Sequence, residues 1–243
     1  MTPEVSRMPK STIGQRNWPG LTGALSLPSD RPRPEKWSYG AARLPFAIAP
    51  AVHGALLEAA RTHHTGLFTA LHAAVTLLLA RLSGATDIAI GAPVAGHGHP
   101  SLDDVVGMFV NTVVLRTQVE STTTFDDLVA RCSGHRVAGV RARGCAVRAP
   151  GGDPRSRTVT VVAPVLPGRD LARKLRPRRT RCRRTHFDIT PSPLDIAKCD
   201  PHFYFTERHD GTGAPDGIDA KLVYSTDLFN KGLRAVLSTR SEL

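Results

Sequence analysis

The residues from Gly66 to Ser83 most strongly constrain how this chain can fold. Their large apolar side chains recur at helical spacing and form one continuous stripe, made of Leu67, Leu71, Val75, Leu78 and Leu82. A helix this apolar must be largely buried. Gly84 ends it, and two β-like runs follow at Asp87–Val94 and Phe109–Val119. The sequence therefore predicts an α/β fold in which this helix packs on a sheet.

Further elements are expected on both sides of this core. Ala42–Ile48 alternates as a strand does, and Pro50 can begin a helix that runs to about His63. Thr124, followed by two aspartates, is typical of a helix start, and that helix should run through Leu128 and Val129. After Arg131 the helical period is lost. Two β-like runs, His202–Asp210 and Ala220–Thr226, flank a Gly/Pro/Asp turn and predict a hairpin.

The positive charge of the chain is concentrated in one segment. The whole sequence has a formal net charge of +11, yet residues Arg136 to Arg184 hold 15 basic and 2 acidic side chains. The rest of the chain is slightly acidic. A charge run of this density repels itself and cannot pack in a core. As an alternative function, the segment Arg136–Arg184 could bind nucleic acid as a basic arm, although no aromatic residues interleave it for stacking on bases.

Several other classes of protein are disfavoured by the sequence. The N-terminus has no apolar run typical of a signal peptide, and no stretch has the roughly 18 consecutive apolar residues that a membrane span needs. The four cysteines, Cys132, Cys145, Cys182 and Cys199, show no metal-ligand spacing, so we expect free thiols. These features predict a cytoplasmic protein without a membrane partner.

The histidines were considered as catalytic or metal-binding groups. His63 and His64 fall at a helix end, where we expect a solvated turn, and His72 should be a packed or partly exposed member of the apolar helix. His97 and His99 have no evident third ligand. Ser101 has no accompanying acid, so a Ser-His hydrolase site is not supported.

Several phrases, taken together and in order, resemble the condensation domain of nonribosomal peptide synthetases. They are LPSDRPRP with GAARLPFAI, LFTALHAAVTLLLARLSGATDIAIGAPVAGH, VGMFVNTVVLR, FDDLVAR, AKCD, TERHD and YSTDLF. The resemblance covers about half of the chain and implies the C-terminal lobe of a two-lobed fold like that of chloramphenicol acetyltransferase, here incomplete. The residues that carry it at the floor of the family's tunnel are Val106, Gly107, Phe109, Val110, Asn111, Thr112 and Arg116.

The resemblance also implies a reaction and its partners. In this family, two carrier proteins bring substrates on phosphopantetheine arms, and the amine of one attacks the thioester of the other to form a peptide bond. No cofactor is expected to bind directly. The family's catalytic motif, HHxxxDG, belongs to the N-terminal lobe. His63-His64 is followed by Thr65 to Thr69 without the Asp-Gly pair, so we assign no catalytic residue and expect no condensation by this chain alone.

The sequence departs from the family pattern after FDDLVAR. Back-translation of Ala142–Pro167 and a shift of one nucleotide permit a reading that contains DVPFERLVE and SSHPFFQ, which resemble the phrases that the family has there. We therefore divide the chain into a poorly matched segment (1–20), a first part of the lobe (21–131), an Arg-rich disordered or frameshifted segment (132–185) and a last part of the lobe (186–243).

This organisation leads to three further expectations. Met1 would be a false start within a longer gene, and the chain would fold poorly because the altered segment leaves apolar surface uncovered. A stand-alone acyltransferase would need a catalytic HxxxD motif. That spacing occurs at His99–Asp103, but in the loop before VGMFVNT rather than where the family keeps its catalytic histidine.

Overall fold

The structure is a computed structural model that describes residues 25–95, 110–141, 160–162, 197 and 201–230. The chain divides into two compact units. Unit 1 comprises Met1–Pro28 and Ala55–Pro164, and unit 2 comprises Ser29–Gly54 and Val165–Leu243.

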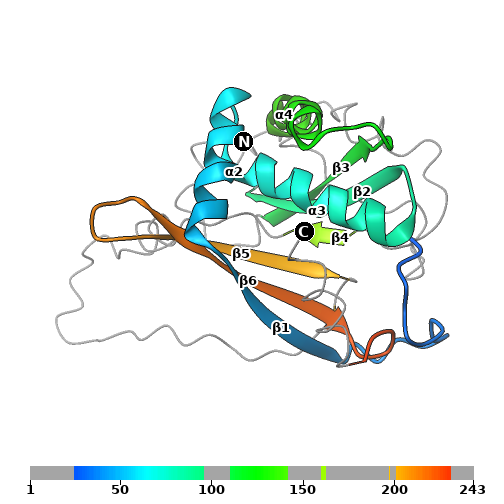
Figure 1. Cartoon of the computed structure of the whole chain (residues 1–243). Helices are drawn as coiled ribbons and strands as arrows, with labels where there is room; N and C mark the ends of the chain where they lie inside the picture. The colour runs from blue at the N-terminus through cyan, green and yellow to red at the C-terminus, as the bar shows by residue number, and fades with distance from the viewer. Residues whose placement is uncertain (1–24, 96–109, 142–159, 163–196, 198–200, 231–243) are drawn as a thin grey trace, which may run out of the picture. The chain divides into compact units, whose positions relative to one another are not determined.

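Unit 1 contains a mixed sheet with helices packed on it, as the sequence predicts. Strand β2 (Asp87–Ala95) lies between β3 (Val110–Gln118), which runs antiparallel to it, and the short strand β4 (Thr160–Val162), which runs parallel to it. Helix α3 (Leu67–Ser83) packs against β2 and against α4 (Phe125–Arg141), which also contacts β3 (Figure 1). Strand β4 lies within the Arg-rich segment (132–185).

Helix α3 is the apolar helix that the sequence predicts, and it is buried on more than one side. Leu67, Leu71 and Val75 of the stripe are buried, whereas Leu78 and Leu82 are half-buried. Leu79 and Thr76, outside the predicted stripe, are also fully buried, because α3 faces both a strand and a second helix. Gly84 ends the helix in the left-handed conformation, with φ of 69°, and its amide donates to the carbonyl of Ala80 at 2.9 Å.

Helix α4 begins as predicted and ends later than predicted. The hydroxyl of Thr124 accepts a hydrogen bond from the amide of Asp127 at 3.1 Å, and the Asp127 carboxylate accepts one from the Thr124 amide at 3.2 Å. The helix then continues ten residues past Arg131, to Arg141. The predicted end at Arg131 was therefore wrong for the backbone. No proline occurs between Arg131 and Pro150, and extending an established helix costs little once its first turn has formed.

Unit 2 contains an antiparallel sheet in the order β1-β6-β5 (Figure 1). The predicted hairpin is confirmed as β5 (His202–His209) and β6 (Pro215–Ser225), although β6 begins five residues before the predicted Ala220. The turn is held by the Asp210 carboxylate, which accepts hydrogen bonds from the amides of Thr212 and Ala214 at 2.8 and 2.9 Å. Strand β1 (Ala41–Ile48) pairs along β6.

Helix α2 (Pro50–Thr62) follows β1 directly, starts in unit 2 and ends in unit 1. The predicted strand Ala42–Ile48 and helix Pro50–His63 are thus confirmed to within one residue at each end. No single described helix is long and apolar enough to span a membrane; α2 and α3 reach that length and apolarity only as a pair, bent by 107°.

Candidate functional site

The phrase VGMFVNTVVLR enters the described part of the chain at the start of β3. Val106, Gly107 and Phe109 lie outside the described residues, so the structure leaves their predicted role untested. Val110, Asn111 and Thr112 open the strand, opposite Ala95, Val94 and Pro93 of β2 respectively. The two strands therefore bring the end of GAPVA beside the start of VNT, two parts of the chain that the sequence separates by a loop.

Arg116, the last residue of the phrase, forms a two-pronged ion pair with Asp87. Its Nε donates to Asp87 Oδ1 at 2.9 Å, and its Nη2 donates to Oδ2 of the same carboxylate. Because Ala89 is the residue directly opposite Arg116, Asp87 occupies the diagonal position on the same face. The side chains are 20% and 31% exposed, so water screens the pair incompletely. The hydrogen bond from Arg116 to Asp87 raises the pKa of the guanidinium further above its ordinary value.

The other face of this hairpin is apolar and supports it. Ile88 and Ile90 of β2 are fully buried, and so are Leu128 and Val129 of α4. Cys132 of α4 lies on the same inner side, 2% exposed, and its sulfur is 3.8 Å from the hydroxyl of Thr117 on β3. Burial raises the pKa of the Cys132 thiol to about 11, so this thiol is protonated at neutral pH.

The histidines of unit 1 have structural surroundings. His63 Nε2 lies 2.7 Å from Asp126 Oδ1, which joins the turn after α2 to the first turn of α4. Its side chain is 19% exposed, so the expected solvated turn is wrong for His63 and correct for the exposed His64. His72 is buried and stacks on Phe68, with ring centroids 6.3 Å apart. His97, His99 and Ser101 lie outside the described residues.

Unit 2 holds a histidine-carboxylate cluster that the sequence reasoning missed. Oε1 of Glu207 is 3.1 Å from Nε2 of the fully buried His53 and 3.3 Å from Nε2 of His209. A carboxylate oxygen only accepts, so the hydrogen bond between His53 and Glu207 requires the tautomer of His53 with its proton on Nε2. His53 and Glu207 are 154 residues apart. The sole hint in the sequence is the two-residue spacing of Glu207 and His209, although a register shift between them interrupts the regular strand.

This cluster is not a metal centre as it stands. Both imidazoles approach the same oxygen atom of one carboxylate rather than converging on a shared empty position. Within the described ranges, no three His, Cys, Asp or Glu side chains are grouped so that they could hold a metal ion.

Comparison with known proteins assigns the chain to a family. The family model described as "Condensation domain" matches residues 17–144, which include α3, β2, β3 and α4. The chain belongs to the condensation-domain family. The resemblance inferred from the phrases VGMFVNTVVLR and FDDLVAR is thereby confirmed, and the comparisons gave no support to the nucleic-acid alternative.

Relatives of this condensation domain are large synthetases. The chain is 33% identical over 241 residues to a dimodular nonribosomal peptide synthase from Bacillus subtilis (strain 168), an alignment that covers 90% of this chain and 9% of the relative. It is 30% identical over 242 residues to an isonitrile lipopeptide synthase from Mycobacterium tuberculosis, covering 91% and 9% respectively.

Solved structures agree on the fold. The X-domain from teicoplanin biosynthesis superposes with a TM-score of 0.78 at 23% identity, over 95% of this chain and 52% of that one. The first condensation domain of the CDA synthetase gives a TM-score of 0.63 at 17% identity, over 95% and 48%. The predicted α/β fold like that of chloramphenicol acetyltransferase is confirmed, and the chain spans about half the length of these structures.

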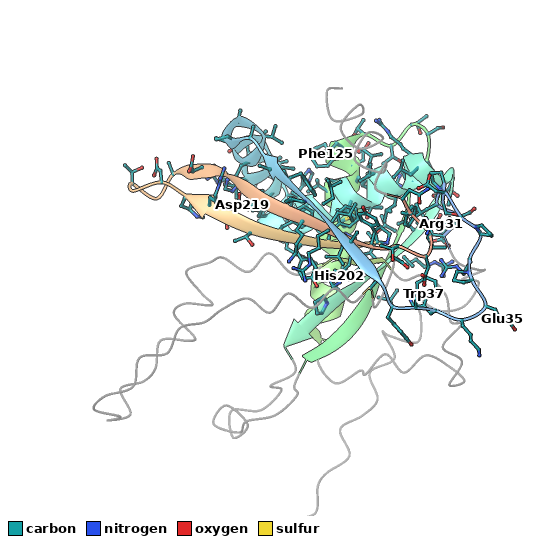
Figure 2. The ribbon with its side chains drawn as sticks, turned by 90° about the horizontal axis from the view of Figure 1, so that it is seen from below. Arg31, Glu35, Trp37, Phe125, His202 and Asp219 are labelled. Atoms are coloured by element: carbon teal, nitrogen blue, oxygen red, sulfur yellow. The ribbon has the colours of Figure 1, made fainter. Side chains whose placement is uncertain are left out.

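The remaining condensation-domain phrases of the sequence fall in unit 2. Asp227, from YSTDLF, accepts hydrogen bonds from the amide and the hydroxyl of Ser38 at 2.8 and 2.6 Å, and these bonds lower the pKa of its carboxyl group. The indole of Trp37 donates to the carbonyl of Ala197, from AKCD, at 3.5 Å. Arg31 and Trp37 lie on the segment before β1 (Figure 2). In unit 2 these phrases therefore hold the segment before β1 in place.

Proposed function

We propose that this chain supplies the C-terminal lobe of a condensation domain whose reaction joins two carrier-bound groups through a peptide bond. The main support for this proposal is the family match over residues 17–144, which includes the β2–β3 hairpin and Arg116. In the reaction, the amine nitrogen of one aminoacyl group attacks the thioester carbon of the other. The C–N bond forms, the C–S bond breaks, the thiol of the second arm leaves, and the amine gives up a proton.

The proposal assigns the proton transfer to a part that this sequence does not encode. The 243 residues contain no HHxxxDG phrase, and His63 is engaged with the carboxylate of Asp126. The histidine-carboxylate cluster of unit 2 is built around a single glutamate oxygen, with His53 fully buried. We therefore expect Val110–Thr112 and Arg116 to shape the floor of the site, and a lobe with HHxxxDG to provide the catalytic histidine.

A reconstituted condensation assay tests this assignment. The assay uses two carrier proteins, one bearing a donor acyl group and one bearing an acceptor amino acid, both on phosphopantetheine. They are mixed with this chain, with a polypeptide carrying the HHxxxDG lobe, or with both. Mass spectrometry of the acceptor arm reports the product. We expect the dipeptide only with both polypeptides, and none when the second histidine of HHxxxDG is replaced by alanine. Product from this chain alone would refute the assignment, as would no product from the pair.

The partners follow from the same proposal. One relative is named a dimodular nonribosomal peptide synthase, and this chain covers 9% of its length. This supports carrier proteins and adjacent synthetase domains as partners, with substrates held on phosphopantetheine rather than on a cofactor of this chain. The cytoplasmic location stays a prediction.

We further propose that the segment 132–185 arises from two compensating shifts of reading frame. The family match ends inside this segment, at residue 144, and this loss of the family pattern supports the proposal, as does the shifted reading that restores DVPFERLVE and SSHPFFQ. Sequencing of the locus tests it directly. Two nearby insertions or deletions relative to sister genes are expected, whereas an intact frame with the same codons in those genes would refute it.

A further inference from the structure

We propose that the Asp87–Arg116 ion pair locks the register of the β2–β3 hairpin, which makes Asp87 a positioning residue for the segment Val110–Thr112. The consequence for condensation rests on the proposed function. The register itself can be measured without any reaction. Asp87 lies in the preceding family phrase, LFTALHAAVTLLLARLSGATDIAIGAPVAGH, and nothing in that phrase links it to Arg116.

More residues lie between β2 and β3 than a tight turn contains, so the contacts between the two strands are important for their register. Tight two-residue turns set a register by their geometry, but here residues 96–109 separate the two strands. A slip of one residue would turn the fully buried Ile88 and Ile90 to the opposite face, which burial forbids. A slip of two residues keeps every side chain on its own face, so the alternation of buried and exposed residues does not forbid it.

The ion pair distinguishes the observed register from the two-residue slips. At present Arg116 lies opposite Ala89 and reaches Asp87 on the diagonal with two hydrogen bonds. In one slip Arg116 would face Gly91, four residues along β2 from Asp87, and the pair would break. In the other, Arg116 would face Asp87 directly, and both bonds would have to be remade in a new geometry.

The pair therefore holds Val110 opposite Ala95 and Thr112 opposite Pro93. A slip toward Gly91 would shift this segment by two residues, roughly 7 Å at the usual rise along a strand. Displacements much smaller than this disrupt a site that depends on the positions of its groups.

Disulfide trapping measures the register. In a chain whose native cysteines are replaced by alanine, Ala92→Cys is combined with Val113→Cys, its partner in the observed register, or with Leu115→Cys, its partner after the slip toward Gly91. We expect the first pair to cross-link and the second to do so rarely. Asp87→Asn should raise the ratio of slipped to native cross-link about tenfold, the size expected for losing hydrogen bonds to a charged group.

Two controls separate the lock from a general loss of stability. Glu120→Gln removes the exposed Glu120–Arg131 pair beside the same hairpin and should leave the ratio unchanged. The exchange Asp87→Arg with Arg116→Asp should return the ratio toward its original value. If Asp87→Asn prevents folding, Arg116→Lys is tested in its place, because it keeps the positive charge and loses the two-pronged hydrogen bonding to Asp87. An unchanged ratio in the folded variant, or no recovery in the exchanged chain, overturns the proposal.

The two proposals fail in different experiments. Asp87→Asn could slip the register while the reconstituted pair still condenses at the original rate. That result would support the ion pair as the lock of the register and would refute its role in positioning Val110–Thr112. An unchanged register would remove the lock while the condensation assay still decides the proposed function.

Discussion

The buried thiol of Cys132 gives a stability that should disappear at high pH. Its pKa is raised from 9.0 to about 11, because the side chain is almost fully buried beside Thr117 and the charged thiolate is poorly solvated there. Between these two values the unfolded chain loses the proton and the folded chain keeps it. Deprotonation therefore favours the unfolded state, and the free energy of unfolding falls as the pH rises through this range.

The size of the effect follows from the pKa. A rise from 9.0 to about 11 corresponds to about 3 kcal/mol at 1.36 kcal/mol per unit. Tyrosines and lysines titrate in the same range, so the quantity to measure is the difference between the original chain and Cys132→Ala. We expect this difference to be constant up to pH 8 and to fall by about 2–3 kcal/mol by pH 11.

Urea unfolding at a series of pH values provides the measurement, with the alkylation rate of Cys132 as an independent readout. Peptide mass spectrometry separates Cys132 from Cys145, Cys182 and Cys199. Alkylation of Cys132 at pH 8 should be far slower in buffer than in urea, because only the thiolate reacts. A difference that stays flat through pH 11, or equally fast alkylation in both conditions, would show that the inner face of α4 does not bury this thiol.

Three further predictions concern the two units and the reading frame. Gly217→Ala should cost unit 2 about 2 kcal/mol or more in thermal unfolding, since φ is 91° and the new Cβ would lie 2.7 Å from the carbonyl oxygen of Ile48. Gly213→Ala, at φ of 89° in open space, should cost about 1 kcal/mol, and equal losses in the two variants would contradict the contact with Ile48. Asp227→Asn should destabilise the chain by about 1 kcal/mol near neutral pH, because the carboxylate accepts hydrogen bonds from Ser38. The lowered pKa of this carboxyl group stabilises the folded state only while the group is ionised, so the difference should vanish as the pH falls through that pKa. A difference independent of pH would refute this prediction. Restoring the shifted frame over 132–185 should raise soluble yield and the urea midpoint, and no gain would count against the frameshift.

The elements that the sequence predicted are those whose signal is local. The stripe in α3, the end of that helix at Gly84 and the helix start at Thr124 each depend on residues within one or two turns, and all three are found where expected. The end of α4 was missed because Ser133, Gly134 and Gly139 obscure the apolar period while the backbone continues to Arg141. The start of β6 at Pro215 was missed because its first residues resemble a turn.

In the candidate site, too, the residues were predicted where the signal is local, and their partners were not. Arg116 was named from its phrase, but its partner Asp87 became visible only in the register of β2 against β3. The cluster of Glu207 with His53 and His209 was missed because two of its members are 154 residues apart. The sequence placed His63 at a helix end, but only the structure showed that Asp126 lies beside its imidazole.

The sequence by itself determined the family and the main helices and strands, because family phrases, apolar period and capping residues act over short distances along the chain. Only the tertiary structure decided which charged groups meet. An ion pair such as Asp87–Arg116 depends on strand register, and register is set by the packing of side chains far apart in sequence.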